Sequence, residues 1–191
     1  IGVVGSDDKK EHVLSLGAKG VLNRKDFNCW GQLPTVNGPE FNDYMKESRK
    51  FGKAIWELTD KKDVDIVFEH PGESTFPVSV FVVKRGGMVV ICAGTTGFNL
   101  TMDARFLWMR QKRVQGSHFA NLKQASAANQ LVINRRIDPG MSEVFPWEDI
   151  PAAHDKMLDN KHLPGNMAVL VTSPKPGLRT VEDVLAVNGQ A

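Results

Sequence analysis

Residues 64–94 read VDIVFEHPGESTFPVSVFVVKRGGMVVICAG, and this stretch is the strongest indication of the fold. The apolar run over residues 64–68 predicts a buried strand, and the run over residues 88–92 predicts a second one. Between them, Pro77 falls in the first turn of a predicted helix, where proline is tolerated, and the helix runs to Lys84. A strand, a helix and a strand in this order are typical of a β-α-β unit in a parallel sheet.

The alternation of short strands and helices continues on both sides of this unit. We expect further strands over residues 1–5, 20–22, 114–117, 141–145 and 167–171. We expect helices over residues 8–16, 41–60, 125–136 and 150–160, and a surface loop over residues 23–40. The sequence therefore predicts an α/β fold, with part of a doubly wound parallel, Rossmann-like sheet over residues 1–136 and a separate C-terminal segment over residues 137–191.

The composition is that of a soluble globular protein, with 41% hydrophobic and 24% charged residues in a chain of 191. The formal net charge is +2 and the basic residues are scattered, so no nucleic-acid partner is indicated. No apolar run approaches the roughly 18 residues that a membrane span needs, so no membrane association is expected.

The cysteine and histidine positions argue against a disulfide framework and against a metal site. The two cysteines, Cys29 and Cys92, are far apart, and the five histidines are dispersed without the spacing of metal ligands. We therefore expect a cytoplasmic protein with no metal bound by these residues.

The chain opens directly on an apolar run over residues 1–5, which has the character of a strand. The glycine fingerprint G-x-G-x-x-G, which binds a pyrophosphate, is absent, and residues 94–97 do not fit it. If residues 1–5 form the second strand of a Rossmann sheet, the fingerprint belongs just upstream. We therefore expect the first strand and the glycine-rich turn of this domain to lie in an upstream segment.

The end of the first predicted strand is the place where dinucleotide folds contact the adenosine ribose. No acid stands at that strand end, while Ser6, Lys9 and Lys10 are within reach of it and favour the 2′-phosphate of NADP. Asp7 and Asp8 oppose this interpretation, because carboxylates repel a phosphate. The alternative is a helix start with solvated lysines.

Three later strand ends carry residues that suit chemistry or a flat ligand. Glu69 and His70 follow the strand over residues 64–68, at the edge where open α/β sheets bind ligands. The alternative for His70 is a loop histidine that caps the next helix or faces solvent. Small residues over 92–94 let a ring approach the backbone, and residues 116–121 end the next strand in a similar way; tight packing is the alternative for both.

Together these runs resemble the carboxylating enoyl-CoA reductases, the crotonyl-CoA carboxylase/reductase family within the medium-chain dehydrogenase/reductase superfamily. The most specific are Phe-Glu-His-Pro-Gly over residues 68–72 and Gly-Ser-His-Phe-Ala-Asn over residues 116–121. Leu-Gly-Ala over residues 16–18 and the Gly86-Gly87 pair are shared by the wider superfamily and are weaker. The likeness covers essentially the whole chain.

The resemblance implies a reaction and roles for individual residues. In this family NADPH gives a hydride to the β-carbon of crotonyl-CoA, and the enolate then attacks CO2 through its α-carbon to give ethylmalonyl-CoA. The resemblance implies that His70 positions CO2 through a water molecule, that Glu69 orients His70, and that Ser6 and Lys9 contact the 2′-phosphate. It further implies that the nicotinamide side is lined by Cys92, Ala93, His118, Phe119 and Ala120.

The resemblance also implies partners. Crotonyl-CoA and CO2 are the expected substrates, and residues 137–191 are the expected C-terminal piece of a catalytic domain. The rest of the enzyme is expected from a missing N-terminal half or a complementary chain, and the assembly from copies of the chain in a homotetramer. The isolated chain is accordingly expected neither to bind NADPH tightly nor to turn over.

Two alternatives remain open at this point. The first is a non-carboxylating reductase of the same superfamily, acting on an enoyl thioester, a quinone or an aldehyde. The second is a non-catalytic fragment that supplies an interface through residues 105–113, which include Phe106, Trp108 and Met109. The alternative for that stretch is packing inside its own domain.

Overall fold

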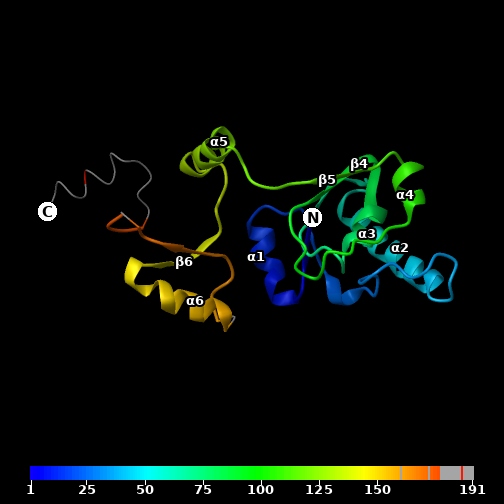
Figure 1. The fold of residues 1–191 in the computed structure, drawn as a ribbon, viewed down its shortest axis with the longest axis horizontal. Coiled ribbons are helices and arrows are strands. Elements are labelled where there is room, and N and C mark those ends of the chain that lie inside the picture. Colours follow the sequence, from blue (N-terminus) through cyan, green and yellow to red (C-terminus); the bar gives the residue numbers. More distant parts are fainter. Residues whose placement is uncertain (160, 172, 177–185, 187–191) are drawn as a thin grey trace. The chain divides into compact units, whose positions relative to one another are not determined.

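A computed structural model describes residues 1–159, 161–171, 173–176 and 186 (Figure 1). The chain divides into two compact parts, an N-terminal unit of Ile1–Phe119 and a C-terminal unit of Ala120–Ala191. The predicted α/β class is confirmed, because helices alternate with strands and every strand pair is parallel. The predicted domain division after residue 136 stays a prediction.

The N-terminal unit begins with two short strands and ends with three longer ones. Its elements are β1 (Gly2–Val4), η1 (Asp7–Lys9), α1 (Lys10–Ser15), β2 (Val21–Asn23), η2 (Arg24–Asp26), α2 (Phe41–Leu58), β3 (Val64–Glu69), α3 (Phe76–Val82), β4 (Val83–Ile91), α4 (Ala104–Trp108) and β5 (Arg113–Gly116). β1 pairs with β2, while β3, β4 and β5 form a second sheet in that order. In the described part of the chain, β1 and β3 therefore belong to separate sheets.

Helix α2 provides the larger core of this unit. Its buried residues recur at a spacing of three and four, which places them on one face of a helix. That face packs against Phe27, Cys29 and Val78. The Phe51 ring meets Phe27 edge-on at 5.1 Å and Trp30 at 5.2 Å between ring centroids. The buried residues of α2 are Phe41, Tyr44, Met45, Ser48, Phe51 and Ile55.

The prediction of a surface loop over residues 23–40 is therefore wrong for its first part. Phe27 and Cys29 are 6% and 1% exposed, because the segment folds back under α2 and adds its apolar side chains to the core. The Gly, Pro and Asn content agrees with the irregular backbone over residues 27–40, but it says nothing about burial.

A second, smaller core lies between α3 and β4. Phe76, Val80, Val83 and Val89 form it. α3 ends at Val82, two residues before the predicted end at Lys84, because Val83 already has an extended backbone. β4 then passes so close to β3 that only a glycine fits at position 87: a Cβ there would lie 2.8 Å from the carbonyl oxygen of Asp65.

Residues 105–113, the predicted interface, contain both packed and exposed aromatic or apolar side chains. Phe106 lies in α4, and its ring packs inside the N-terminal unit at 5.2 Å from Phe81. Trp108 and Met109 are exposed. Packing inside the domain is therefore confirmed for Phe106, and a contact role for the exposed pair stays a prediction.

In its described ranges, the C-terminal unit contains the parallel strand pair β6–β7, the helices α5 and α6 and a short 3-10 helix, η3. Its elements are α5 (Leu122–Ile133), β6 (Met141–Phe145), η3 (Trp147–Asp149), α6 (Ile150–Leu158) and β7 (Asn166–Val169), and β6 pairs with β7. α5 starts three residues earlier than predicted, because Asn121 and Gln124 form a reciprocal capping box.

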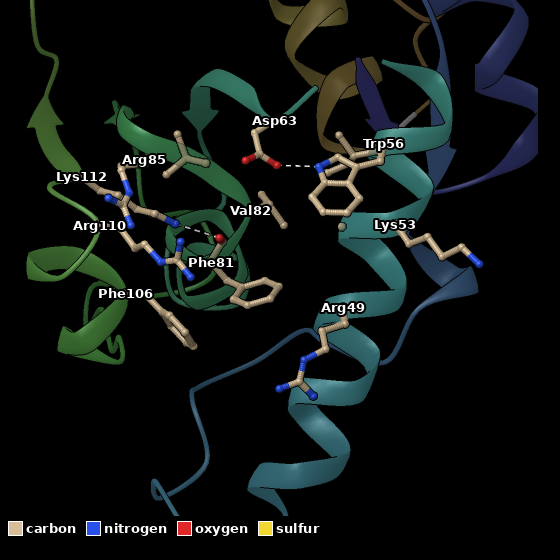
Figure 2. Close-up of a pocket in the computed structure, with 13 residues that line it drawn as sticks. Arg49, Lys53, Trp56, Asp63, Phe81, Val82, Arg85, Phe106, Arg110 and Lys112 are labelled. Carbon is tan, nitrogen blue, oxygen red and sulfur yellow. Dashed lines mark hydrogen bonds between the residues drawn. The ribbon is translucent and has the colours of Figure 1, made fainter. Parts of the chain in front are cut away.

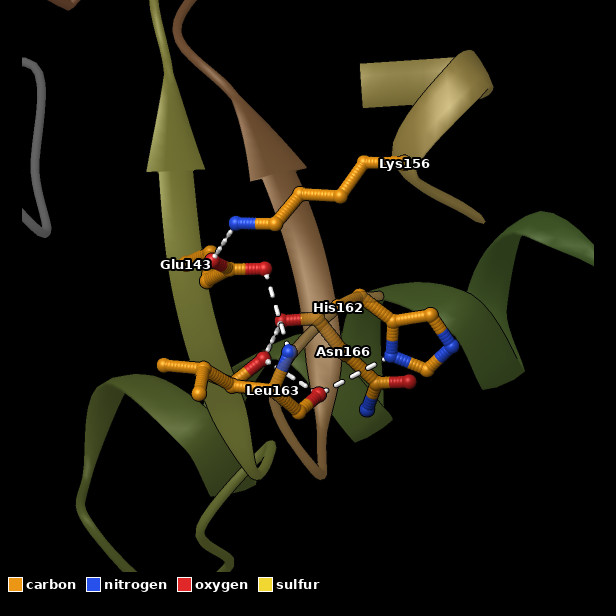
Figure 3. Close-up of polar contacts among 6 residues, drawn as sticks. Glu143, Lys156, His162, Leu163 and Asn166 are labelled. Atoms are coloured by element: carbon orange, nitrogen blue, oxygen red, sulfur yellow. Dashed lines mark hydrogen bonds and ion pairs between the residues drawn. The ribbon is translucent and has the colours of Figure 1, made fainter. Parts of the chain in front are cut away.

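The turn before β7 is held by polar contacts (Figure 3). Lys156 of α6 pairs with Glu143 of β6, and this contact lowers the pKa of the Glu143 carboxyl. The other Glu143 oxygen accepts a hydrogen bond of 3.3 Å from the backbone N–H of Leu163. His162 Nδ1 lies 2.9 Å from the Leu163 carbonyl oxygen. These contacts tie α6, β6 and the turn together.

Apolar side chains in the C-terminal unit are mostly exposed. Ala153 is the one hydrophobic residue buried among those described there, while Leu122 and Leu158 are 87% and 85% exposed. Among the described residues, none of the helices combines the length and the apolar character required to cross a bilayer.

The aromatic cluster around Phe51 supports a stability prediction. Replacing Phe51 by Ala removes a buried ring and leaves a cavity, so we expect the free energy of unfolding to fall by about 3–5 kcal/mol in urea titrations. Trp108→Ala is the control, because its side chain is exposed and its loss is expected to change stability by no more than about 0.5 kcal/mol. Equal effects of the two changes would contradict the assignment of this core.

Candidate functional site

Three strands of the second sheet end side by side. Glu69 of β3 pairs with Ile91 of β4, which in turn pairs with Gly116 of β5. Because the strands are parallel, the residues that follow them, including His70 and Cys92, share one edge of the sheet. This is the edge at which open α/β sheets bind ligands.

Glu69 is buried at the end of β3, with 2% of its surface exposed. One carboxylate oxygen accepts a 3.0 Å hydrogen bond from the backbone N–H of Gly72 and another hydrogen bond from the Thr75 hydroxyl. The other oxygen accepts from the Ser79 hydroxyl. A buried carboxylate needs such donors to be tolerated. Glu69 therefore fixes the loop that carries His70 to the first turns of α3.

The loop after β3 is joined to the loop after β4. Thr96 contributes twice, because its backbone N–H and its hydroxyl both donate to the Pro71 carbonyl, at 2.9 and 2.8 Å. Gly72 has a φ of +87°, and a Cβ on it would lie 2.8 Å from the Cα of Gly94. Only glycine fits this approach. His70 is exposed on this doubly anchored loop.

Cys92 and the segment after β5 complete this edge. The Cys92 backbone N–H donates to the Glu69 carbonyl at 3.2 Å, and the Ser117 N–H donates to the Ile91 carbonyl at 2.8 Å. The rings of His118 and Phe119 lie against each other, with centroids 3.9 Å apart. The structure thus brings His70 and Cys92 to one edge and starts the 117–119 segment from it.

Ala93 and Ala120 were predicted to line the nicotinamide side, and the structure gives only their positions. Ala93 follows Cys92 directly and is partly buried, and Ala120 is the first residue of the C-terminal unit. Their predicted contact with a nicotinamide stays a prediction. The same holds for Cys92, His118 and Phe119, whose positions alone do not define a ligand.

The predicted phosphate contacts follow β1, in the other sheet. Lys10 forms an ion pair of 2.6 Å with Asp7, and Asn23 donates to the same carboxylate at 3.1 Å. The hydrogen bond from Lys10 is the main cause of the lowered pKa of Asp7. A hydrogen bond with Ser6 likewise lowers the pKa of the Asp8 carboxyl.

The ion pair between Lys10 and Asp7 weakens the argument that Asp7 and Asp8 would repel a phosphate. The charge of Asp7 is balanced by Lys10, so Asp7 repels an incoming phosphate less than an isolated carboxylate would. Lys9 is exposed. The predicted roles of Ser6, Lys9 and Lys10 stay predictions.

Arg24 is a candidate that sequence reasoning missed. It follows β2, whose last residue, Asn23, pairs with Val4 at the end of β1. Its Nε lies 3.6 Å from the position that a Cβ on Gly5 would occupy. A parallel neighbour of the first strand that ends in Asn-Arg-Lys was the available signal, because parallel strands end at the same edge.

The described residues provide no cluster of side chains that could bind a metal ion. In the ranges that the structure covers, no group of three His, Cys, Asp or Glu side chains gathers closely enough to hold an ion. Instead, the exposed imidazole of His70 and the exposed thiol of Cys92 lie at the carboxyl end of the β3–β5 sheet, and basic side chains follow β1.

Comparison with known proteins places this arrangement in a family. Residues 1–134 match the family of zinc-binding dehydrogenases, and the chain belongs to that family. The residues that the structure describes do not fit the zinc named in the family's description, because no group of metal-binding side chains gathers among them.

The resemblance to carboxylating reductases is confirmed. The chain is 70% identical, over its whole length, to the crotonyl-CoA carboxylase/reductase of Cereibacter sphaeroides, of which it covers 45%. It is 41% identical to the crotonyl-CoA reductase of Streptomyces avermitilis, over 93% of this chain and 39% of the relative. The chain thus spans less than half the length of these curated relatives.

A solved structure agrees with these relatives. A crotonyl-CoA carboxylase/reductase in complex with NADP superposes with a TM-score of 0.84 at 43% identity, over 91% of this chain and 43% of the other. The fold of the two chains is therefore shared through most of the present chain.

The Glu69 contacts give a second stability prediction. In Glu69→Ala the Gly72 N–H and the Thr75 and Ser79 hydroxyls lose their common acceptor, so we expect a loss of at least about 1–3 kcal/mol in the free energy of unfolding. Glu57→Ala removes an exposed carboxylate and serves as the control in the same denaturant titration. An unchanged stability of Glu69→Ala would refute the anchoring role.

The two cysteines are predicted to react very differently with Ellman's reagent. Cys29 is 1% exposed, and burial raises the pKa of its thiol to about 12, so its thiolate is scarce as well as inaccessible. Cys92 is exposed. We expect one thiol per chain to react under native conditions and two in denaturant, and none to react natively in Cys92→Ser.

Proposed function

We propose that this chain forms part of an enzyme that carries out NADPH-dependent reductive carboxylation of crotonyl-CoA to ethylmalonyl-CoA. The observation that carries the proposal is the joint anchoring of the His70 loop and the Cys92 strand end at one sheet edge. The 70% identity to a crotonyl-CoA carboxylase/reductase supports it. Because the chain spans 45% of that relative, the complete activity requires the remaining part of the enzyme.

The residues after β1 and β2 suit the 2′-phosphate of NADPH. Ser6 offers a hydroxyl, Lys9 an exposed ammonium and Arg24 a planar guanidinium, which matches phosphate geometry. Gly5 leaves the space beside Arg24 free, since no Cβ stands there. These groups fit NADP better than NAD, whose ribose hydroxyl is usually bound by an acid at this place.

The residues after β3, β4 and β5 suit the reacting end of the cofactor and the substrate. When bound, NADPH supplies a hydride to the β-carbon of the enoyl thioester, which leaves an enolate at the α-carbon. Cys92 and Ala93 are small enough to let the nicotinamide approach the backbone. His118, Phe119 and Ala120 are proposed to cover it and to keep water away from the enolate.

His70 is proposed to position CO2 for attack by the enolate. Its imidazole can hold a water molecule or a polar substrate by a hydrogen bond. A fixed position is what such a role demands, because small displacements of a positioning group are costly. Glu69 meets this demand through the loop: it binds Gly72 and Thr75 and so limits where the neighbouring His70 can lie.

A second function is favoured by one specific comparison. The relatives from Streptomyces avermitilis and Streptomyces collinus, at 41% and 39% identity, carry the name crotonyl-CoA reductase, in which carboxylation is not mentioned. In a reductase the enolate takes a proton at the α-carbon, giving butyryl-CoA. The two activities share the cofactor and the hydride step. They differ in whether the α-carbon of the enolate reacts with CO2 or with a proton.

A chimera tests the proposal directly. The matching segment of the Cereibacter sphaeroides relative is replaced by this chain, and the product made from NADPH and crotonyl-CoA is identified by mass, with and without bicarbonate and carbonic anhydrase. We expect ethylmalonyl-CoA when CO2 is present. Butyryl-CoA under both conditions would favour the second function, and a folded chimera that leaves NADPH unoxidised would contradict both.

His70 has its own prediction in the same chimera. In His70→Ala we expect NADPH oxidation to continue while the carboxylated fraction of the product falls, because hydride transfer does not need the imidazole. His154→Ala changes an exposed histidine of α6 and is the control. An unchanged product ratio in His70→Ala would remove His70 from the carboxylation step.

Arg24 is predicted to select the cofactor. In Arg24→Gln we expect the KM for NADPH to rise roughly tenfold or more, since a charge-assisted hydrogen bond to the 2′-phosphate is lost. The KM for NADH is expected to stay unchanged, because that cofactor has no phosphate there. A parallel rise for both cofactors would show that Arg24 acts on the structure and not on the phosphate.

A further inference from the structure

Figure 2 shows the residues that line a cavity at the amino end of the β3–β5 sheet. It has a volume of about 580 Å3 and opens between α2 and the starts of β4 and β5. Val83 and Arg85 begin β4 there, and Lys112 precedes the first residue of β5. The cavity therefore belongs to the amino ends of these strands, while His70 and Cys92 follow their carboxyl ends.

The walls of the cavity are apolar and aromatic. Trp56 lines one side from α2, and Phe81 and Phe106 line another, with ring centroids 5.2 Å apart. The indole N–H of Trp56 donates to Asp63 at 2.5 Å, which fixes the orientation of the ring. A flat apolar group of ligand size fits such a space, since ligand pockets commonly measure about 300–1,000 Å3.

The charges around these rings are almost all positive. Arg49, Arg85, Arg110 and Lys112 line the cavity, and the one acid there, Asp63, accepts from Trp56. Figure 2 shows Arg49 reaching from α2 toward the side that carries Arg110, whereas Lys53 points away from it. In the described ranges none of the three arginines takes part in an ion pair.

Lys112 is a partly buried cation at the wall of the cavity. Its ammonium donates to the carbonyls of Val80 and Phe81, at 2.7 and 2.9 Å, and so caps the end of α3. Burial, with a smaller contribution from Arg110, lowers the pKa of Lys112 to about 8. A cationic cavity of this kind gains stability from any anion that enters it, because the anion offsets the mutual repulsion of the cations.

We infer that this cavity binds a small organic anion, in which a negatively charged head group lies between Arg49 and Arg110 and a flat apolar body packs against Trp56, Phe81 and Phe106. The guanidinium groups supply forked donors that suit a phosphate or a carboxylate. The aromatic walls select for the body of the ligand, since a bare anion leaves them in contact with water. The inference does not rest on the proposed function, because no residue of the cofactor edge takes part in it.

Phenyl phosphate is a suitable probe, with inorganic phosphate and benzyl alcohol as partial mimics. Binding is measured by calorimetry with the whole chain, and its location by the indole N–H resonance of Trp56, assigned through its loss in Trp56→Phe. We expect phenyl phosphate to bind more tightly than either partial mimic and to shift that resonance. Equal binding of inorganic phosphate, or of benzyl alcohol, would overturn the inference, as would binding that leaves the Trp56 signal unmoved.

A matched pair of variants tests the cations. In Arg49→Gln/Arg110→Gln we expect the dissociation constant for phenyl phosphate to rise roughly tenfold or more, because two charge-assisted contacts are lost. Arg135→Gln/Arg136→Gln removes two exposed arginines of the C-terminal unit and is expected to leave the constant unchanged. Arg110→Gln alone carries the same test if the double variant loses its fold. An equal effect of both double variants would reduce the site to general charge attraction.

Discussion

The carboxylate of Glu69 is the contact on which the proposed site depends. Glu69 is the last residue of β3, and its carboxylate accepts hydrogen bonds from Gly72 in the loop, from Thr75 at the N-cap of α3 and from Ser79 within α3. A buried acid is costly unless donors surround it, so the same requirement that fixes Glu69 also fixes the chain around it. The loop after β3 is also held from the β4 side, because Thr96, which follows β4, donates two hydrogen bonds to the Pro71 carbonyl. One carboxylate thus connects strand, loop and helix at the edge where His70 stands.

The sequence predicted the positions of most strands closely, but it placed the start of β4 at residue 88 where the structure has Val83, and it predicted the helix ends less well. Period and apolar character placed β3 and β6 almost to the residue, because short apolar runs bounded by glycine, proline or charge have few other solutions. The predicted helix ends differ from the observed ones where a cap or the start of the next strand sets the boundary. α5 begins early because Asn121 and Gln124 cap it, and α3 ends early because Val83 belongs to the next strand.

The candidate site could be predicted in part. That His70 and Cys92 would share an edge followed from parallel strands alone, without any knowledge of contacts. The position of Arg24 could not be read in the same way, because it depends on the pairing of β2 with β1 and on the space left by Gly5. The burial of Phe27 and Cys29 also escaped prediction, since it arises from packing against α2, a helix that begins more than ten residues later.

Strand β3 presents apolar side chains to solvent. Ile66 and Phe68 alternate along the strand and are 62% and 69% exposed, so one face of an apolar strand meets water. Segments of high strand propensity with little charge stack readily with copies of themselves. Within this strand Asp65, paired with Lys84, is the charge that interrupts the run. Because the hydrogen bond from Lys84 lowers the pKa of Asp65, this carboxylate keeps its charge in more acidic solution than an isolated aspartate would, and the strand keeps that charge with it.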